Sequence, residues 1–478
     1  MASIGRGPEL CWDPSHTMTA LPAPDLVPLR LLLVRHGLSS FNTERRIQGR
    51  DDLSCLTDEG HSQARLTGAA LADLHLDAVY SSPLSRAAAT AAQLLEAQGG
   101  GLSAEFDDDL LEVDLAPWSG LLGSEVKARF PEAYRLWREA PDQLELERSD
   151  GSRFRPIPEL MDQARRWLDR LEREHLDQAD QSGKDLTTVL VVAHSAILRC
   201  LVLQLLGLPA SRFQGLRLEN ASLSVFNLQR QAGGGVQVQI ESLNVTAHLG
   251  NGLPPKGAGA RLLLVRHGET DWNRQGRFQG QIDIPLNVNG LAQARSAADF
   301  LSDVPIQRAF TSSMARPRQT AEAILTAHPG VLLSNQEGLV EIGHGQWEGR
   351  LEQEISQTWG ELLQQWKDAP HTVQMPEGEN LQQVWDRSLA CWSGLADGLE
   401  ADETALVVAH DAVNKTILCA LLGLTPADIW MVKQGNGGVS VIDWPPPDSA
   451  GRALPVVTCL NLTTHLGGVI DRTAAGAL

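Results

Sequence analysis

Short, wholly apolar runs recur along this 478-residue chain, and polar segments separate them. Three examples are Leu31–Val34, Val189–Ala193 and Leu406–Ala409. An uninterrupted apolar run of this kind is typical of a strand that is buried on both faces of a sheet. Apolar and charged residues follow helical spacing in other segments, among them 64–74, 86–96 and 163–176. This alternation predicts an open, mostly parallel α/β sheet with helices on both faces, in other words three α/β/α layers.

The same pattern occurs twice. Leu-Leu-Leu-Val-Arg-His-Gly stands at 31–37 and again at 262–268, and Val-Val-Ala-His stands at 191–194 and at 407–410. The offset between the copies falls from 341 − 112 = 229 to 410 − 194 = 216, a difference of 13. We therefore expect an insertion in the first copy, and residues 142–158 are predicted to form it as a surface loop.

A repeat of more than 200 residues is too long for a solenoid unit, so it indicates a duplicated domain. The length agrees with two or three domains at roughly 100–200 residues each. The Gly- and Pro-rich segment 251–259 is the predicted linker. The predicted organisation is a flexible N-terminal tail (1–28), a first domain (29–250), the linker (251–259), a second domain (260–468) and a C-terminal tail (469–478).

Charge narrows the possible partners. Lys plus Arg is 40 and Asp plus Glu is 59, which gives a net charge of −19. A surface this acidic argues against nucleic-acid binding and against docking to anionic lipid. Any phosphate site must therefore be a local cluster of basic side chains.

Location is suggested by the cysteines and by the apolar runs. The six cysteines contain no C-x-x-C pair, which favours free thiols and a cytoplasmic protein. Residues 1–28 do not resemble a signal peptide, and no apolar run approaches the roughly 18 residues that a membrane span needs.

Two predicted strands in each copy end directly in a histidine. These are His36 and His194 in the first copy, and His267 and His410 in the second. Ligands of open α/β sheets bind at the carboxyl ends of strands, so each pair is expected to meet in one crevice if its strands are neighbours. Arg35 and Arg266 precede the first histidine of each copy. Arg86 and Arg316 open helices, whose free N–H groups also favour anions.

This set of residues suits phosphoryl transfer. A neutral imidazole can attack phosphorus and form a covalent intermediate, while arginine binds phosphate oxygens in pairs. Glu112 or Glu341 could protonate the leaving group and then activate water. The expected chemistry needs no metal ion and no cofactor.

Four motifs recur in order in both copies: Arg-His-Gly, Ser-x-x-x-Arg-x-x-x-Thr-Ala, a glutamate six residues before tryptophan, and a late strand that ends in Ala-His. With them the chain resembles the histidine phosphatase superfamily, also called the phosphoglycerate mutase-like family. The resemblance implies phosphohistidine formation at His36 and His267 and proton donation by Glu112 and Glu341. It assigns phosphate binding to Arg35, Arg86, Asn42 and His194, and to Arg266, Arg316, Asn273 and His410.

The resemblance implies a phosphatase for a small phosphorylated metabolite, such as a sugar or sugar-acid phosphate. The tandem form resembles two-domain members of photosynthetic bacteria, described as 2-carboxy-arabinitol-1-phosphate or α-ribazole phosphatases. A phosphoglycerate-type phosphomutase is the alternative. In a third hypothesis one copy only binds a phosphorylated ligand or partner and regulates the other. The two copies could also pack as an intramolecular pseudo-dimer.

The first copy motivates the third hypothesis because it departs from the family pattern. Leu38 replaces a polar residue, Ala116-Pro117 replaces Gly-x, and Pro156-Ile-Pro-Glu159 replaces Pro-x-Gly-Glu.

A purely structural role also stays open for several residues. Glu112 and Glu341 could have a merely structural role, and the asparagines could only cap turns. Trp118 and Trp347 could only pack, and His248 and His465 are predicted to be structural residues in strands. No role is assigned to His344.

Overall fold

The structure is a computed structural model that describes residues 29–177, 186–231, 234–447 and 454–473. The predicted N-terminal tail (1–28) and the end of the C-terminal tail (474–478) lie outside the described residues.

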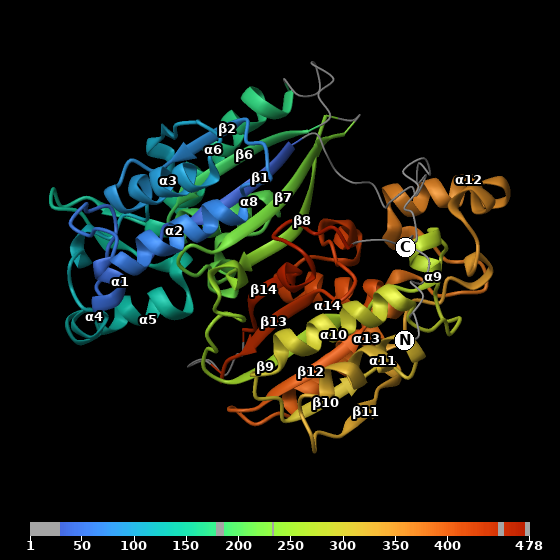
Figure 1. Cartoon of the computed structure of the whole chain (residues 1–478). Helices are drawn as coiled ribbons and strands as arrows, with labels where there is room; N and C mark the ends of the chain where they lie inside the picture. Colours follow the sequence, from blue (N-terminus) through green and yellow to red (C-terminus); the bar gives the residue numbers. More distant parts are fainter. Residues whose placement is uncertain (1–28, 178–185, 232–233, 448–453, 474–478) are drawn as a thin grey trace, which may run out of the picture.

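One sheet of 12 strands runs through both copies of the repeat (Figure 1). In the first copy the order from the centre outward is β8 (Val236–Val245), β7 (Leu223–Arg230), β1 (Leu29–Arg35), β6 (Thr187–Ala193), β2 (Ala78–Ser81) and β3 (Glu105–Phe106). The second copy has the same order: β14 (Val456–Leu462), β13 (Val439–Trp444), β9 (Ala260–Arg266), β12 (Thr404–Ala409), β10 (Arg308–Thr311) and β11 (Leu333–Asn335). The outer four strands of each copy are parallel, and the inner two are antiparallel to their neighbours.

The two half-sheets join at β8 and β14, which lie antiparallel with Leu243 opposite Leu460 (Figure 1). Asn244 Nδ2 donates to the carbonyl oxygen of Thr458 at 2.6 Å, and the equivalent Asn461 Nδ2 donates to the carbonyl oxygen of Glu241 at 2.8 Å. The contacts across this join are therefore reciprocal, as in an interface with twofold symmetry.

Alternate side chains of each central strand face opposite helical layers, as strand geometry requires. Leu32 and Val34 pack in the core beside α2 (Asp58–Ala70) and α3 (Ser85–Gln98). Leu31 and Leu33 pack on the other face, in the core that contains residues of α6 (Pro156–Leu171) and α8 (Ser195–Leu205).

The second copy repeats these layers with α10 (Val288–Leu301) and α11 (Ala315–Leu325) on one face, and with α13 (Leu381–Asp397) and α14 (Asp411–Leu422) on the other. The predicted three-layer α/β/α architecture is confirmed. The core around Leu31 also includes Leu264 of the second copy, so this face is one continuous apolar cluster.

Shorter or more peripheral helices complete the described chain: α1 (Ser40–Glu44), α4 (Gly123–Arg129), α5 (Pro131–Glu139), α9 (Asp271–Gln275) and α12 (Glu352–Asp368). Among the described residues, no helix is long and apolar enough to cross a membrane.

Two local predictions need correction. Residues 142–158 are not simply a loop, because they contain the hairpin of β4 (Leu146–Glu147) and β5 (Arg153–Phe154), and α6 begins within them. Leu146 and Phe154 are buried, which ties the hairpin to the core. His248 and His465 lie in short 3₁₀ turns, η6 (Ala247–Leu249) and η11 (Thr464–Leu466), rather than in strands.

Candidate active site

The structure brings the two histidines of each copy together. β1 and β6 are parallel neighbours in which Arg35 lies opposite Ala193, so His36 and His194 follow at the same edge of the sheet. Their ring centroids are 5.2 Å apart, and the rings of His267 and His410 are also 5.2 Å apart. All four side chains are buried.

The first histidine of each pair is held in one tautomer. Nδ1 of His36 lies 2.8 Å from the carbonyl oxygen of Gly37, and Nδ1 of His267 lies 2.7 Å from that of Gly268. A carbonyl oxygen only accepts, so Nδ1 must carry the proton and Nε2 keeps its lone pair. In the second copy Nε of Arg316 donates to that Nε2 at 3.2 Å.

Glycine after this histidine is a steric requirement. A Cβ atom on Gly37 would lie 2.5 Å from the carbonyl oxygen of Gly60, and one on Gly268 would lie 2.5 Å from that of Gly290. Gly60 and Gly290 lie in the first turns of α2 and α10. The Arg-His-Gly motif thus lets a strand end pass directly against a helix.

Hydrogen bonds to backbone carbonyl oxygens orient the arginine side chains. Nη2 of Arg86 donates to Gly49 at 2.9 Å, and Nη2 of Arg316 donates to Gly280 at 2.8 Å. Arg35 Nη1 donates to the carbonyl oxygen of Leu218 at 2.8 Å. Nε of Arg35 and Nε of Arg86 are buried and have no hydrogen-bond partner within the described parts of the chain. These N–H groups are suited to an anion.

The second histidine of each pair is held from its other nitrogen. Nε2 of His194 lies 2.8 Å from Ser82 Oγ, and Nε2 of His410 lies 3.0 Å from Ser312 Oγ. Nδ1 of each ring is buried without a partner among the residues that the structure describes. An unpartnered buried nitrogen is unfavourable unless a ligand satisfies it.

Burial lowers the pKa of all four histidines well below the ordinary value of 6.5, and the nearby arginines lower it further. The imidazoles therefore stay neutral at pH 7. A neutral Nε2 beside several guanidinium groups is a nucleophile placed where an anionic ester can bind.

The two glutamates differ between the copies. Glu341 is buried, and burial raises the pKa of its carboxyl group, while the charge of Arg316 opposes this shift. Glu112 instead accepts hydrogen bonds at 3.1 Å from the N–H of Ala196 and at 3.3 Å from that of Ile197, in the first turn of α8. The carboxylate of Glu112 thus caps the helix that follows His194.

Asn42 and Asn273 do form turn caps. The Oδ1 atom of Asn42 accepts from the N–H of Ser39, and that of Asn273 accepts from the N–H of Thr270. With the oxygen used in this way, each NH₂ group is the end that could donate to a ligand.

Sequence reasoning missed Asn220 and Asn436. Nδ2 of Asn220 donates to the carbonyl oxygen of His36 at 3.0 Å and to Oδ1 of Asn42 at 3.0 Å. Nδ2 of Asn436 donates to the carbonyl oxygen of His267 at 3.2 Å. Both stand 26 residues after the second histidine (220 − 194 and 436 − 410), a repeated spacing that could have revealed them.

The tryptophans and histidines for which a purely structural role was an alternative are packed among other groups of the protein. Trp118 and Trp347 are buried. His248 Nε2 lies 3.0 Å from Thr67 Oγ1, and His465 Nε2 lies 3.1 Å from the carbonyl oxygen of Gly437. His344 sits in an aromatic cluster, with its ring centroid 5.1 Å from that of Phe278 and 6.1 Å from that of Trp366.

Comparison with known proteins gives the family. The histidine phosphatase superfamily (branch 1) matches residues 31–241 and 262–452. The 2-carboxy-D-arabinitol-1-phosphatase of Triticum aestivum is 30% identical over 471 residues, which covers 93% of this chain and 88% of that protein. Phosphoserine phosphatase 1 of Hydrogenobacter thermophilus is 31% identical over 210 residues, or 43% of this chain and 94% of that protein.

Among solved structures, the alpha-ribazole phosphatase of Shigella flexneri aligns at 26% identity and a TM-score of 0.38, over 42% of this chain and 96% of that one. Because the family match spans most of both copies, the expected phosphatase class of enzyme is confirmed at the level of the family, and the chain belongs to the histidine phosphatase superfamily.

Proposed function

We propose that the chain hydrolyses a small phosphorylated metabolite, a sugar or sugar-acid phosphate, through a phosphohistidine formed without a metal ion. The observation that carries this proposal is the fixed tautomer of His36 and His267, whose Nε2 lone pairs lie among arginines. The printed name of the wheat relative, a phosphatase of a carboxylated sugar phosphate, supports the substrate class.

In the first step, Nε2 of His267 attacks phosphorus while the bond from phosphorus to the ester oxygen breaks. Protonated Glu341 gives its proton to the departing alkoxide. In the second step, the Glu341 carboxylate takes a proton from water, the water oxygen attacks phosphorus, the bond from phosphorus to Nε2 of His267 breaks, and inorganic phosphate leaves. His36 and Glu112 take these roles in the first copy.

The basic side chains hold the phosphoryl oxygens throughout. Arg266, Arg316 and His410 do so in the second copy, with Asn273 beside them. Arg35, Arg86, His194 and Asn42 are their equivalents. The buried Nδ1 atoms of His194 and His410 and the Nε atom of Arg86 are the groups that a phosphoryl oxygen would satisfy.

A second candidate function, regulatory binding by the first copy, is favoured by one contact. Glu112 Oε1 accepts hydrogen bonds from the N–H groups of Ala196 and Ile197, so its carboxylate caps α8 and would have to give up these contacts to serve a leaving group. A copy that binds phosphate but turns over slowly would act as a ligand-binding module.

The organisation that goes with this function has two catalytic-type domains, 29–250 and 260–468, joined by the linker 251–259. They pack as an intramolecular pseudo-dimer through β8 and β14. The free thiols of the five described cysteines are the basis for a cytoplasmic location.

The test is phosphate release from sugar, sugar-acid and glycerate phosphates in the presence of EDTA. Isomerisation without release would favour the mutase alternative.

A further inference from the structure

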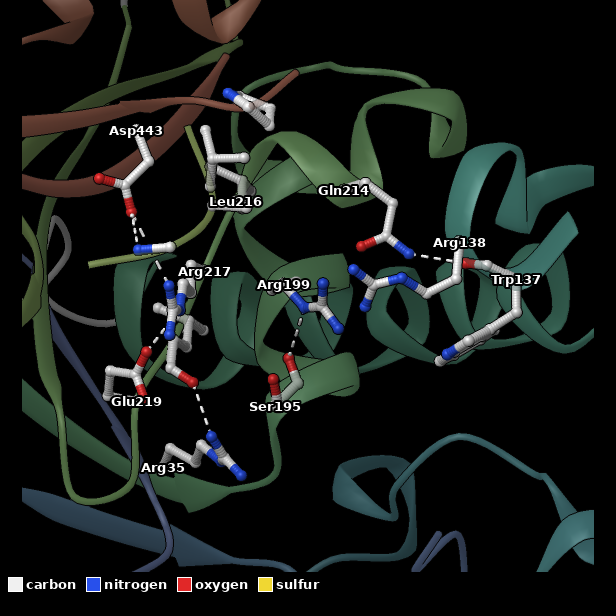
Figure 2. A pocket seen from close by; sticks show the side chains of 15 residues that line it. Arg35, Trp137, Arg138, Ser195, Arg199, Gln214, Leu216, Arg217, Glu219 and Asp443 are labelled. Atoms are coloured by element: carbon white, nitrogen blue, oxygen red, sulfur yellow. Dashed lines mark hydrogen bonds and ion pairs between the residues drawn. The ribbon is translucent and has the colours of Figure 1, made fainter. Parts of the chain in front are cut away.

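A cavity of about 520 Å³ adjoins the site of the first copy and is walled by the second copy (Figure 2). Arg35 and Ser195 of the site line it, Gly257 comes from the predicted linker, and Asp443 and Pro445 come from the second copy. The volume lies within the range of roughly 300–1,000 Å³ that small-molecule sites occupy.

The cavity is basic although the chain as a whole is acidic. Arg35, Arg138 and Arg199 line it, and none of them has a carboxylate within ion-pair distance among the described residues. Arg217 differs, because it pairs with Glu219 at 2.5 Å. Figure 2 shows the guanidinium groups of Arg138 and Arg199 pointing toward one another, with Ser195 beside Arg199.

Arg199 is held firmly in this position. Its guanidinium stacks on Phe213 at 3.7 Å from the ring centroid, and its Nε donates to the carbonyl oxygen of Ser195 at 3.3 Å. Burial lowers the pKa of Arg199 to about 10; the charge of Glu112 opposes this shift, and the positive charges of Arg35 and Arg138 add to it. Like charges gathered in this way are stabilised by a bound anion.

The second copy neutralises the equivalent positions internally. Asp411 follows His410 where Ser195 follows His194, and Lys415 stands where the first copy has Arg199. Asp411 Oδ1 lies 3.2 Å from Arg266 Nη1, and Asp411 Oδ2 lies 2.8 Å from Lys415 Nζ. Asp411 thus supplies a carboxylate to the basic side chains of the second copy, whereas Ser195 supplies none at the equivalent position of the first copy.

We propose that Arg138 and Arg199, next to Arg35 and Ser195, bind a second anionic group of the substrate, a carboxylate or a second phosphate, in the first copy alone. The reacting phosphate would sit at His36, and the second anion would lie in the cavity between the copies. This inference rests on the proposed function for the identity of the first anion.

The test measures binding by calorimetry to the full-length His36→Ala/His267→Ala double variant, which cannot form the phosphohistidine. The ligands share the six-carbon skeleton of glucose: glucose 6-phosphate has one anionic group, 6-phosphogluconate has a carboxylate at C1 in addition, and glucose 1,6-bisphosphate has a second phosphate there. We expect at least one of the two doubly anionic ligands to bind about tenfold tighter than glucose 6-phosphate. The preferred ligand tells which anion the cavity takes.

Three variants in the same background assign the preference. Ser195→Asp reproduces the residue of the second copy, and Arg138→Gln alters an exposed side chain; both are expected to abolish the preference. Lys415→Gln, a change at the second-copy position that corresponds to Arg199, should keep it. Equal affinity for all three ligands, survival of the preference in both first-copy variants, or its loss in Lys415→Gln would overturn the proposal.

Hydrolysis is scored separately on the wild type. A protein that binds 6-phosphogluconate preferentially but releases no phosphate would refute the proposed function and not this inference. Phosphate release without any binding preference would refute this inference and not the proposed function.

Discussion

Nδ1 of His267 lies 2.7 Å from the carbonyl oxygen of Gly268, and the same contact, at 2.8 Å, links His36 to Gly37. The peptide group next to each histidine therefore fixes which ring nitrogen keeps a lone pair. Any change that moves the glycine carbonyl should misplace the nucleophile.

Gly268→Ala is expected to do this, because its Cβ would lie 2.5 Å from the carbonyl oxygen of Gly290. In the His36→Ala background, where only the second copy can act, we expect kcat/KM to fall by about 10²-fold. Gly360→Ala is the matched control, since nothing lies within 4 Å of the added Cβ. Equal activities of the two variants would show that this contact does not position the imidazole.

The pH profile of the second copy follows from two opposite shifts. The pKa of His267 is lowered by burial and by Arg316, so the nucleophile stays neutral as pH falls below 6.5. The pKa of Glu341 is raised by burial, so the acid is lost only as pH rises through a value above 4.5. We therefore expect the pH profile of kcat/KM, measured in the His36→Ala variant, to show no titration of His267 near pH 6.5.

In the His36→Ala background, Glu341→Gln should remove the fall of kcat/KM at alkaline pH and lower kcat/KM by about 10²–10⁴-fold. An unchanged profile would exclude Glu341 as the acid.

His344→Phe should stabilise the protein, and more so at acid pH. The imidazole is buried among Phe278 and Trp366, its Nδ1 has no partner in the described residues, and burial lowers its pKa to about 3. Because this pKa is lower in the folded state, protonation favours unfolding, and stability is lost as pH falls from 6.5 towards 3. The gain from the phenylalanine should therefore include about 2 kcal/mol at pH 5 that is absent at pH 7. Urea titrations at both pH values measure it, and an equal gain at the two values would contradict the assignment.

The join between the copies should depend on Asn244 and Asn461. Each has a positive φ, 55° and 50°, which asparagine tolerates better than most side chains, and each donates across the join. The Asn244 side chain donates to the carbonyl oxygen of Thr458 and accepts from the N–H of Glu219, so Asn244→Ala loses both hydrogen bonds and adds backbone strain; we expect the free energy of unfolding to fall by about 3 kcal/mol. Asn244→Gly loses the same two hydrogen bonds without the strain and should lose about 2 kcal/mol. Equal losses in the two variants would mean that φ is not strained.

The sequence predicts the parts of this molecule that depend on local pattern. Strand ends place His36, His194, His267 and His410 at one edge of each half-sheet, because parallel neighbours end together. The three layers follow from the alternation of buried strands and amphipathic helices.

Contacts between distant segments were not predictable from the same patterns. The join of β8 to β14 depends on which edge strands meet, and hydrophobic alternation does not specify that. Asn220 reaches His36 across 184 positions of the chain, and the capping of α8 by Glu112 needs a helix that starts 83 residues later. The charge difference between Ser195 and Asp411 is visible in the sequence, but its meaning appears only when the arginines around it are placed.

The most direct test of the account is phosphate release in EDTA by the wild type, His36→Ala, His267→Ala and the double variant. We predict activity that survives EDTA, falls in His267→Ala, and is abolished in the double variant. The activity that remains in His267→Ala measures the first copy and separates catalysis there from regulatory binding. A double variant as active as the wild type would contradict the phosphohistidine mechanism. Loss of wild-type activity when EDTA is added would contradict its independence of metal ions.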